Sequence, residues 1–191
     1  MRKLAIIAIV LLFAANAAFA DSEEYVVKAK LDKVVRSLDT IKTAISMYVM
    51  EQGTFPGKAD VITQANSGKP LPASSAWSDM GFSVYPTLPP EVLSLSYVPF
   101  NVQAKGGARS FAIVLVLNNI KPGTIDGQLI GFSPSDDMVI TGPASATSAV
   151  GDIRGLTALT FHYGCHQMNS QPVDSLVTNF FTFAGAPMVC K

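Results

Sequence analysis

The chain has 191 residues, and its 14 basic and 14 acidic side chains give a formal net charge of zero. If Arg2 and Lys3 leave with an export signal, 12 basic residues remain against 14 acidic ones, and a charge of about −2 cannot hold a nucleic-acid backbone. Nucleic acid is therefore excluded as an expected partner, and the length suits one domain with a single core.

Residues 1–20 have the three parts of an export signal. Arg2 and Lys3 form a short basic start, and an unbroken apolar run follows over residues 4–13. Ala18 and Ala20 then supply the small-x-small pattern that signal peptidase accepts. The sequence predicts a signal peptide that is removed.

Cleavage is expected directly before Asp21, which would leave residues 21–191 as a single domain in the periplasm or outside the cell. The alternative is a retained membrane helix. The apolar stretch Leu4–Ala20 is 17 residues long and is interrupted by Asn16, which places it at the short limit for a bilayer core of about 30 Å.

Residues from about 22 to 52 have the pattern of one long amphipathic helix. Asp21 or Ser22 can cap its N-terminus, and Gly53 followed by Pro56 ends it. Apolar residues recur at alternating steps of four and three, which places them on one stripe. The stripe consists of Val27, Leu31, Val34, Leu38, Ile41, Ile45 and Tyr48. We expect it to pack against the rest of the domain.

Residues from about 53 to 91 are rich in Pro, Gly, Ser and Ala, which predicts a long connecting loop with short helical pieces. Trp77, Met80, Phe82 and Tyr85 are expected to anchor this loop by burial. A loop of this length also often carries function, so Trp77, Phe82 and Tyr85 are candidate interaction residues as well.

Residues from about 92 to 191 predict an antiparallel sheet and a C-terminal loop, which makes the fold class α+β. One strand is expected within Val92–Ala104 and a second at Phe111–Leu117, with a glycine-rich hairpin turn between them. Shorter strands are expected at Gln128–Phe132, Met138–Thr141 and Leu156–Tyr163, and a surface loop at Gly142–Gly155.

Cys165 and Cys190 are the two cysteines of the chain. An even number in an exported protein predicts a disulfide, and closing a loop of about 25 residues would stabilise the fold by roughly 3.5 kcal/mol. His162 and His166 flank Cys165, but two histidines without a carboxylate cluster are a weak zinc signature. No metal site is expected here.

Several segments occur in the order and spacing found in type IV pilins. They are Tyr25 to Lys30, Ile41 to Tyr48, Gly53 to Pro56, Trp77 to Phe82, Tyr85 to Pro89, and Cys165 with Cys190. The first three resemble the solvent-side half of the pilin helix and its exit, and the next two resemble the connecting loop. The resemblance implies a pilin head, in which a long helix lies on an antiparallel sheet beside a C-terminal disulfide-bounded loop.

The N-terminus departs from that family. A type IV prepilin has a short leader ending in glycine, followed by a hydrophobic helix that bears an early glutamate, and this sequence has neither. An ordinary export signal stands where the pilin membrane helix would be. After cleavage the chain would lack the apolar segment that drives assembly of a pilus.

The sequence contains no phosphate-binding glycine loop, nucleophile elbow or His-Glu-x-x-His motif. The turn at Asp136 and Asp137 offers too few oxygen ligands for calcium. We therefore expect neither a cofactor nor an enzymatic activity.

The function expected from these observations is that of a non-enzymatic pilin-like protein of a Gram-negative-type envelope. It would be a minor or accessory component of a type IV pilus or related assembly, in contact with pilus or envelope proteins or with a surface ligand, and an adhesive role is left open. Two alternatives stay open, a free periplasmic or secreted module for a small ligand or glycan and a fibre-forming pilin that retains its N-terminal helix. Besides the loop around Trp77, the candidate contact residues are Gln167, Asn169 and Gln171.

Overall fold

The computed structural model of the protein describes residues 2–102, 108–134, 138–142, 145–148, 161–166, 173–183 and 189–190. The fold is α+β, as expected. The elements in chain order are α1 (Arg2–Gln52), β1 (Asp60–Thr63), α2 (Ala76–Asp79), β2 (Val92–Val102), β3 (Ala108–Leu117), β4 (Leu129–Ser133), β5 (Met138–Gly142), β6 (Ser145–Ser148), β7 (His162–His166), α3 (Ser175–Phe183) and β8 (Val189–Cys190).

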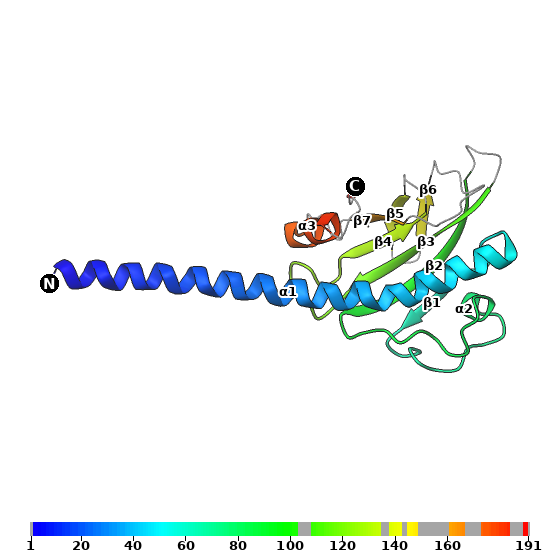
Figure 1. Cartoon of the computed structure of the whole chain (residues 1–191), viewed down its shortest axis with the longest axis horizontal. Helices are drawn as coiled ribbons and strands as arrows, with labels where there is room; N and C mark the ends of the chain where they lie inside the picture. Colours follow the sequence, from blue (N-terminus) through cyan, green and yellow to red (C-terminus); the bar gives the residue numbers. More distant parts are fainter. Residues whose placement is uncertain are drawn as a thin grey trace.

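Six strands form the main sheet in the order β1-β2-β3-β4-β7-β8, and β5 and β6 form a separate hairpin. The pairs β1–β2, β2–β3, β3–β4 and β4–β7 are antiparallel, whereas β7 and β8 are parallel. Figure 1 shows the C-terminal half of α1 lying along this sheet and the N-terminal half projecting well beyond it. The head is therefore built at one end of a long helix.

Several elements differ from the sequence-based expectation. The helix expected over about 22–52 is present, but in the full chain it is the C-terminal part of α1, which runs unbroken from Arg2. Residues 2–20 contain neither glycine nor proline and many good helix formers, so nothing in them interrupts the helix. Ala18, Ala20 and Asp21 all lie within α1.

Three further differences concern short elements. The connecting segment contains a strand, β1, because Ile62 is buried on the sheet and the backbone of β1 pairs with β2. The expected surface loop at Gly142–Gly155 contains β6, which pairs with β5 outside the main sheet. The strand expected at Leu156–Tyr163 begins instead at His162, and residues 149–160 lie outside the described part of the chain.

The predicted apolar stripe of α1 is confirmed. Its first six members are almost completely buried, and Tyr48 is half-buried. They share one core with alternate residues of β3, since successive side chains of a strand point to opposite faces of the sheet. The residues of β3 on this inner face are Phe111, Ile113, Leu115 and Leu117.

The opposite face of β3 is also buried. Ala112, Val114 and Val116 form a second apolar cluster there with Leu129 of β4. The β5–β6 hairpin contacts β2, β3, β4 and β7, so we assign it to this outer face. Burial of both faces explains why β3 is the most apolar strand of the chain.

Polar contacts fix the position of α1 on the sheet. The Lys42 ammonium donates a hydrogen bond to the Tyr163 hydroxyl at 2.5 Å and lies 5.1 Å from the centroid of the same ring. It also lies 5.4 Å from the ring of Phe132 and 5.9 Å from that of Phe161. A cation among aromatic faces is attracted to their electron-rich surfaces, so Lys42 links α1 to β4 and β7.

The end of α1 was predicted correctly. Gly53 has a φ of 66°, which favours glycine, and its N–H donates to the Val49 carbonyl at 2.8 Å. The chain then turns back, and Phe55 enters the core against Phe111 with ring centroids 4.9 Å apart.

Burial of the stripe can be tested by placing the same charged residue at two neighbouring positions of α1. Ile41→Asp should lower the free energy of unfolding by about 4 kcal/mol or more, because it removes buried apolar contacts and leaves a carboxylate without a partner in the core. Thr40→Asp is the control, since Thr40 is exposed, and it should change stability by about 0.5 kcal/mol or less. Urea unfolding followed by circular dichroism measures both, and equal stabilities would contradict the packing of α1.

Candidate functional site

A chain of hydrogen bonds positions α2 within the connecting segment. The carboxylate of Asp60 accepts one hydrogen bond from the Val61 N–H at 2.8 Å and another from the Ser75 hydroxyl. The Ser75 oxygen in turn accepts the Trp77 N–H at 3.1 Å, which makes Ser75 the N-cap of α2. Asp60 therefore ties the strand β1 to the first turn of α2.

The C-terminal end of α2 is closed by backbone hydrogen bonds. The Phe82 N–H donates to the Trp77 carbonyl and the Gly81 N–H donates to the Ser78 carbonyl, both at 3.0 Å. This is the pattern of a Schellman motif, and Gly81 has the left-handed φ of 87° that the motif requires. The Phe82 ring meets the Trp77 ring edge-on with centroids 6.2 Å apart. The segment from Trp77 to Phe82 is thus a single helical turn closed at both ends.

The expected anchoring of this loop by burial is confirmed for three of its four residues. Trp77 is fully buried, and Met80 and Tyr85 are nearly so, whereas Phe82 is half-buried. Burial raises the pKa of the Tyr85 hydroxyl, and the negative charge of Asp60 acts in the same direction, so this hydroxyl is neutral at neutral pH. Trp77 and Tyr85 have too little exposed surface for a direct contact with a partner, which leaves Phe82 as the candidate that reaches the surface.

The last turns of α1 and the turn after α2 enclose a groove of about 340 Å³, which we call the tip groove. Four residues on one face of α1 form one wall, and the segment 79–82 forms the other. The lining residues are Ala44, Met47, Tyr48, Glu51, Asp79, Met80, Gly81 and Phe82. The lining is therefore mainly apolar, with one carboxylate on each wall.

Sequence reasoning missed the contribution of α1 to this groove. The available signal was Met47 and Met50, which are apolar but do not fall on the buried stripe. Both are exposed, with 52% of Met47 and 74% of Met50 accessible to solvent. Apolar residues off the stripe of an amphipathic helix suggest a second contact surface.

The second predicted interaction region lies between Cys165 and Cys190. Gln167, Asn169 and Gln171 fall outside the described residues. The backbone of Cys165 pairs with that of Cys190 in the register of β7 and β8. Sequence reasoning missed the helix α3 in this region.

Helix α3 packs against α1 and the sheet. Val177 and Phe181 are fully buried, and the Phe181 ring lies 5.1 Å from that of Tyr163. The N-terminus of α3 is capped by the Asp174 carboxylate, which accepts the Leu176 N–H at 2.9 Å. A second hollow of about 390 Å³ lies where α1 passes α3, lined by Glu24, Lys28, Leu176, Asn179 and Phe180.

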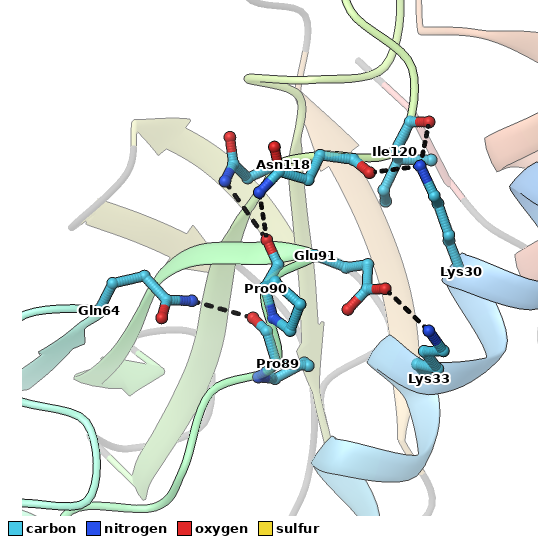
Figure 2. Close-up of polar contacts among 9 residues, drawn as sticks. Lys30, Lys33, Gln64, Pro89, Pro90, Glu91, Asn118 and Ile120 are labelled. Atoms are coloured by element: carbon cyan, nitrogen blue, oxygen red, sulfur yellow. Dashed lines mark hydrogen bonds and ion pairs between the residues drawn. The ribbon is translucent and has the colours of Figure 1, made fainter.

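Figure 2 shows the polar contacts between α1 and the loops at the base of the head. The Lys30 ammonium donates to the carbonyls of Asn119 at 2.7 Å and Ile120 at 3.1 Å. The Lys33 ammonium lies 3.3 Å from the carboxylate of Glu91, a residue that is only 3% exposed. Glu91 is a buried acid, and among the described residues its ion-pair partner is Lys33 of α1. The contact therefore serves to hold α1 on the head.

Side-chain amides reinforce the same loops. The amides of Asn118 and Asn119 donate to the Pro90 carbonyl at 3.3 and 3.1 Å, and that of Gln64 donates to the Pro89 carbonyl at 2.9 Å (Figure 2). They fix the backbone directly before Glu91. The arrangement is that of a structural clamp.

Within the described ranges no three His, Cys, Asp or Glu side chains are grouped closely enough to hold a metal ion, and Asp136 and Asp137 lie outside those ranges. In the same part of the chain no helix combines the length and apolar character needed to cross a membrane.

Comparison with known proteins gives no relative, because no family model, curated protein or solved structure matches this chain. The site is therefore interpreted from its own chemistry. The tip groove combines a mainly apolar lining with one carboxylate on each wall, as surfaces for protein contacts do.

The role of Ser75 in shaping the tip groove can be measured. Ser75→Ala should lower the free energy of unfolding by about 1–2 kcal/mol, because it removes the α2 cap and a hydrogen-bond donor to Asp60. The neighbouring Ser74→Ala should have an effect within about 0.5 kcal/mol, since Ser74 is exposed. Thermal unfolding of the two variants gives the comparison, and equal effects would exclude the capping role.

Proposed function

We propose that this protein is an exported, non-enzymatic, pilin-like interaction protein. In this proposal it is a minor or accessory component of a type IV pilus or a related envelope assembly. The observation that carries the proposal is the arrangement of α1, whose C-terminal half packs on an antiparallel sheet while its N-terminal half projects from the head (Figure 1). This arrangement agrees with the pilin head implied by the sequence resemblance.

The proposal includes a disulfide between Cys165 and Cys190. Support comes from the backbone register, which makes the two residues direct neighbours on β7 and β8. Paired strands lie about 4.8 Å apart, which is within the range of roughly 4.4–6.8 Å that a disulfide needs between Cα atoms. The loop that it would close contains α3, so the bond would hold α3 against α1.

The chemistry of the tip groove supports a binding function. Its lining offers two carboxylates, one phenol, two methionines and one phenylalanine, and no nucleophile paired with a base is among these residues. Glu51 and the apolar side chains can make contacts with a partner without any reaction.

A second candidate is a fibre-forming subunit that retains its N-terminal helix. One observation favours it, namely that α1 continues without a break from Arg2 into the head. The two candidates differ in whether residues 1–20 remain attached.

Processing of the chain distinguishes these candidates. We expect the mature N-terminus at Asp21 and recovery in the soluble periplasmic or extracellular fraction, because Ala18 and Ala20 form the signal-peptidase pattern. Intact mass and N-terminal sequencing of protein from fractionated cells provide the measurement. Recovery of residues 4–20 in membranes or sheared fibres would instead support the fibre-forming subunit.

The disulfide has its own test. Protein isolated without reductant should show no free thiol at Cys165 or Cys190, and Cys190→Ser should lower the melting temperature under oxidising conditions, since it opens the loop. The same substitution should have little effect when the wild-type protein used for comparison is reduced. Labelling of both thiols in the native, exported protein would refute the bond.

A further inference from the structure

The end of α1 that borders the tip groove is electronegative. The carbonyl end of a helix carries a partial negative charge of about half an electron, and basic residues in the last turn usually offset it. The last turn of α1 has no basic residue and contains Glu51, which is exposed. A cation would therefore be favoured at this wall of the groove.

The opposite wall adds a second carboxylate. Asp79 lies 3.7 Å from the ammonium of Lys58, and 55% of the Lys58 side chain is exposed. A contact of this length between exposed groups is weak and exchanges readily with other partners. The walls thus carry two carboxylates against one loosely held ammonium.

The apolar residues that line the groove suit the apolar part of a long cationic side chain. Met47 and Met80 are flexible and polarizable, and Tyr48 and Phe82 present half-buried aromatic rings. Lysine and arginine side chains place their aliphatic stems along apolar surface while keeping the charged end beside water, carboxylates or ring faces. The apolar lining and the two carboxylates match the two parts of such a side chain.

The exposed apolar surface extends beyond the groove itself. Met50, which does not line the groove, is 74% exposed one turn from Met47. An apolar neighbour of the bound cation could cover Met50, which a small free amine could not do. The end of α1 and the turn after α2, which form the groove, lie at the end of the head opposite to the projecting half of α1 (Figure 1).

We propose that the tip groove binds a lysine or arginine side chain that a partner protein presents next to an apolar residue. This inference rests on the proposed function as an interaction protein and adds the chemistry of its partner. The contact is one of charge complementarity to Glu51 and Asp79 within a mainly apolar lining.

The probe is a short peptide with blocked ends and a central Leu-Lys-Leu, compared with two peptides in which norleucine or glutamate replaces the lysine. The protein is used as the cell processes it, labelled with ¹⁵N. We expect the lysine peptide to shift the backbone amide signals of residues 44–51 and 79–82 in a saturable manner, and the other two peptides to bind at least severalfold more weakly.

Two substitutions should act in opposite directions. Glu51→Gln should weaken binding of the lysine peptide by about two- to fivefold, the size expected for one exposed ion pair. Lys58→Gln should tighten binding by up to about twofold, because it releases Asp79 for the peptide. General damage to the fold would weaken binding in both variants.

Matched controls use the ion pair between Asp32 and Arg36, which lie on α1 about 24 Å and about 18 Å from Tyr48 at 1.5 Å per residue. Asp32→Asn and Arg36→Gln change the net charge by the same amounts as the two test variants. Both should leave the dissociation constant of the lysine peptide unchanged. If the controls changed it as much as the test variants do, binding would depend only on the net charge of the protein.

Three results would overturn the inference. The first is binding of the norleucine peptide as tight as that of the lysine peptide, and the second is an unchanged dissociation constant for the lysine peptide in Glu51→Gln. The third is a set of amide shifts at residues 44–51 that depend on protein concentration in the absence of peptide, which would assign the groove to a second copy of the chain. Export is measured separately by cell fractionation. A cytoplasmic protein that binds the peptide would refute the proposed function alone, and an exported protein that does not bind would refute the docking site alone.

Discussion

The structure depends on the burial of one apolar stripe along the C-terminal half of α1. Six side chains from Val27 to Ile45 are almost completely removed from water, and each fully buried aliphatic side chain contributes about 1.5–3 kcal/mol by the hydrophobic effect. The inner faces of β2, β3 and β4 supply the surface that covers the stripe. The same apolar contacts hold the sheet in place, because the sheet is the surface that covers the stripe of α1.

Burial alone would allow α1 to slide or rotate on the sheet, and polar contacts select one position. Lys30 and Lys33 bind the loops at the base of the head, and Lys42 lies among the aromatic rings of β4 and β7. A partly buried ion pair such as Lys33 with Glu91 adds little net stability, because the charges lose hydration. Its directional geometry nevertheless favours one register of α1 on the sheet.

The same organisation decides where a partner can bind. The outward N–H and C=O groups of Val61 in the edge strand β1 bond to the side chains of Asp60 and Asn66, and Asn66 also accepts the Thr63 N–H at 2.6 Å. An edge with satisfied backbone groups resists addition of another strand. At this edge recognition is then left to side-chain surfaces, and the tip groove is formed because Asp60, Ser75 and the Schellman turn hold α2 beside the end of α1.

The sequence by itself determined the long helix, its apolar stripe, its end at Gly53, the β2–β3 hairpin and the burial of Trp77, because each rests on local periodicity or on one residue's chemistry. It did not reveal β1 or α3. These elements are short, and their formation depends on pairing with β2 and packing on α1, which are contacts between residues far apart in the chain. The tip groove likewise arises only when Met47 and Glu51 on α1 are brought beside Asp79 and Phe82, about 30 residues later, so only the tertiary structure could define it.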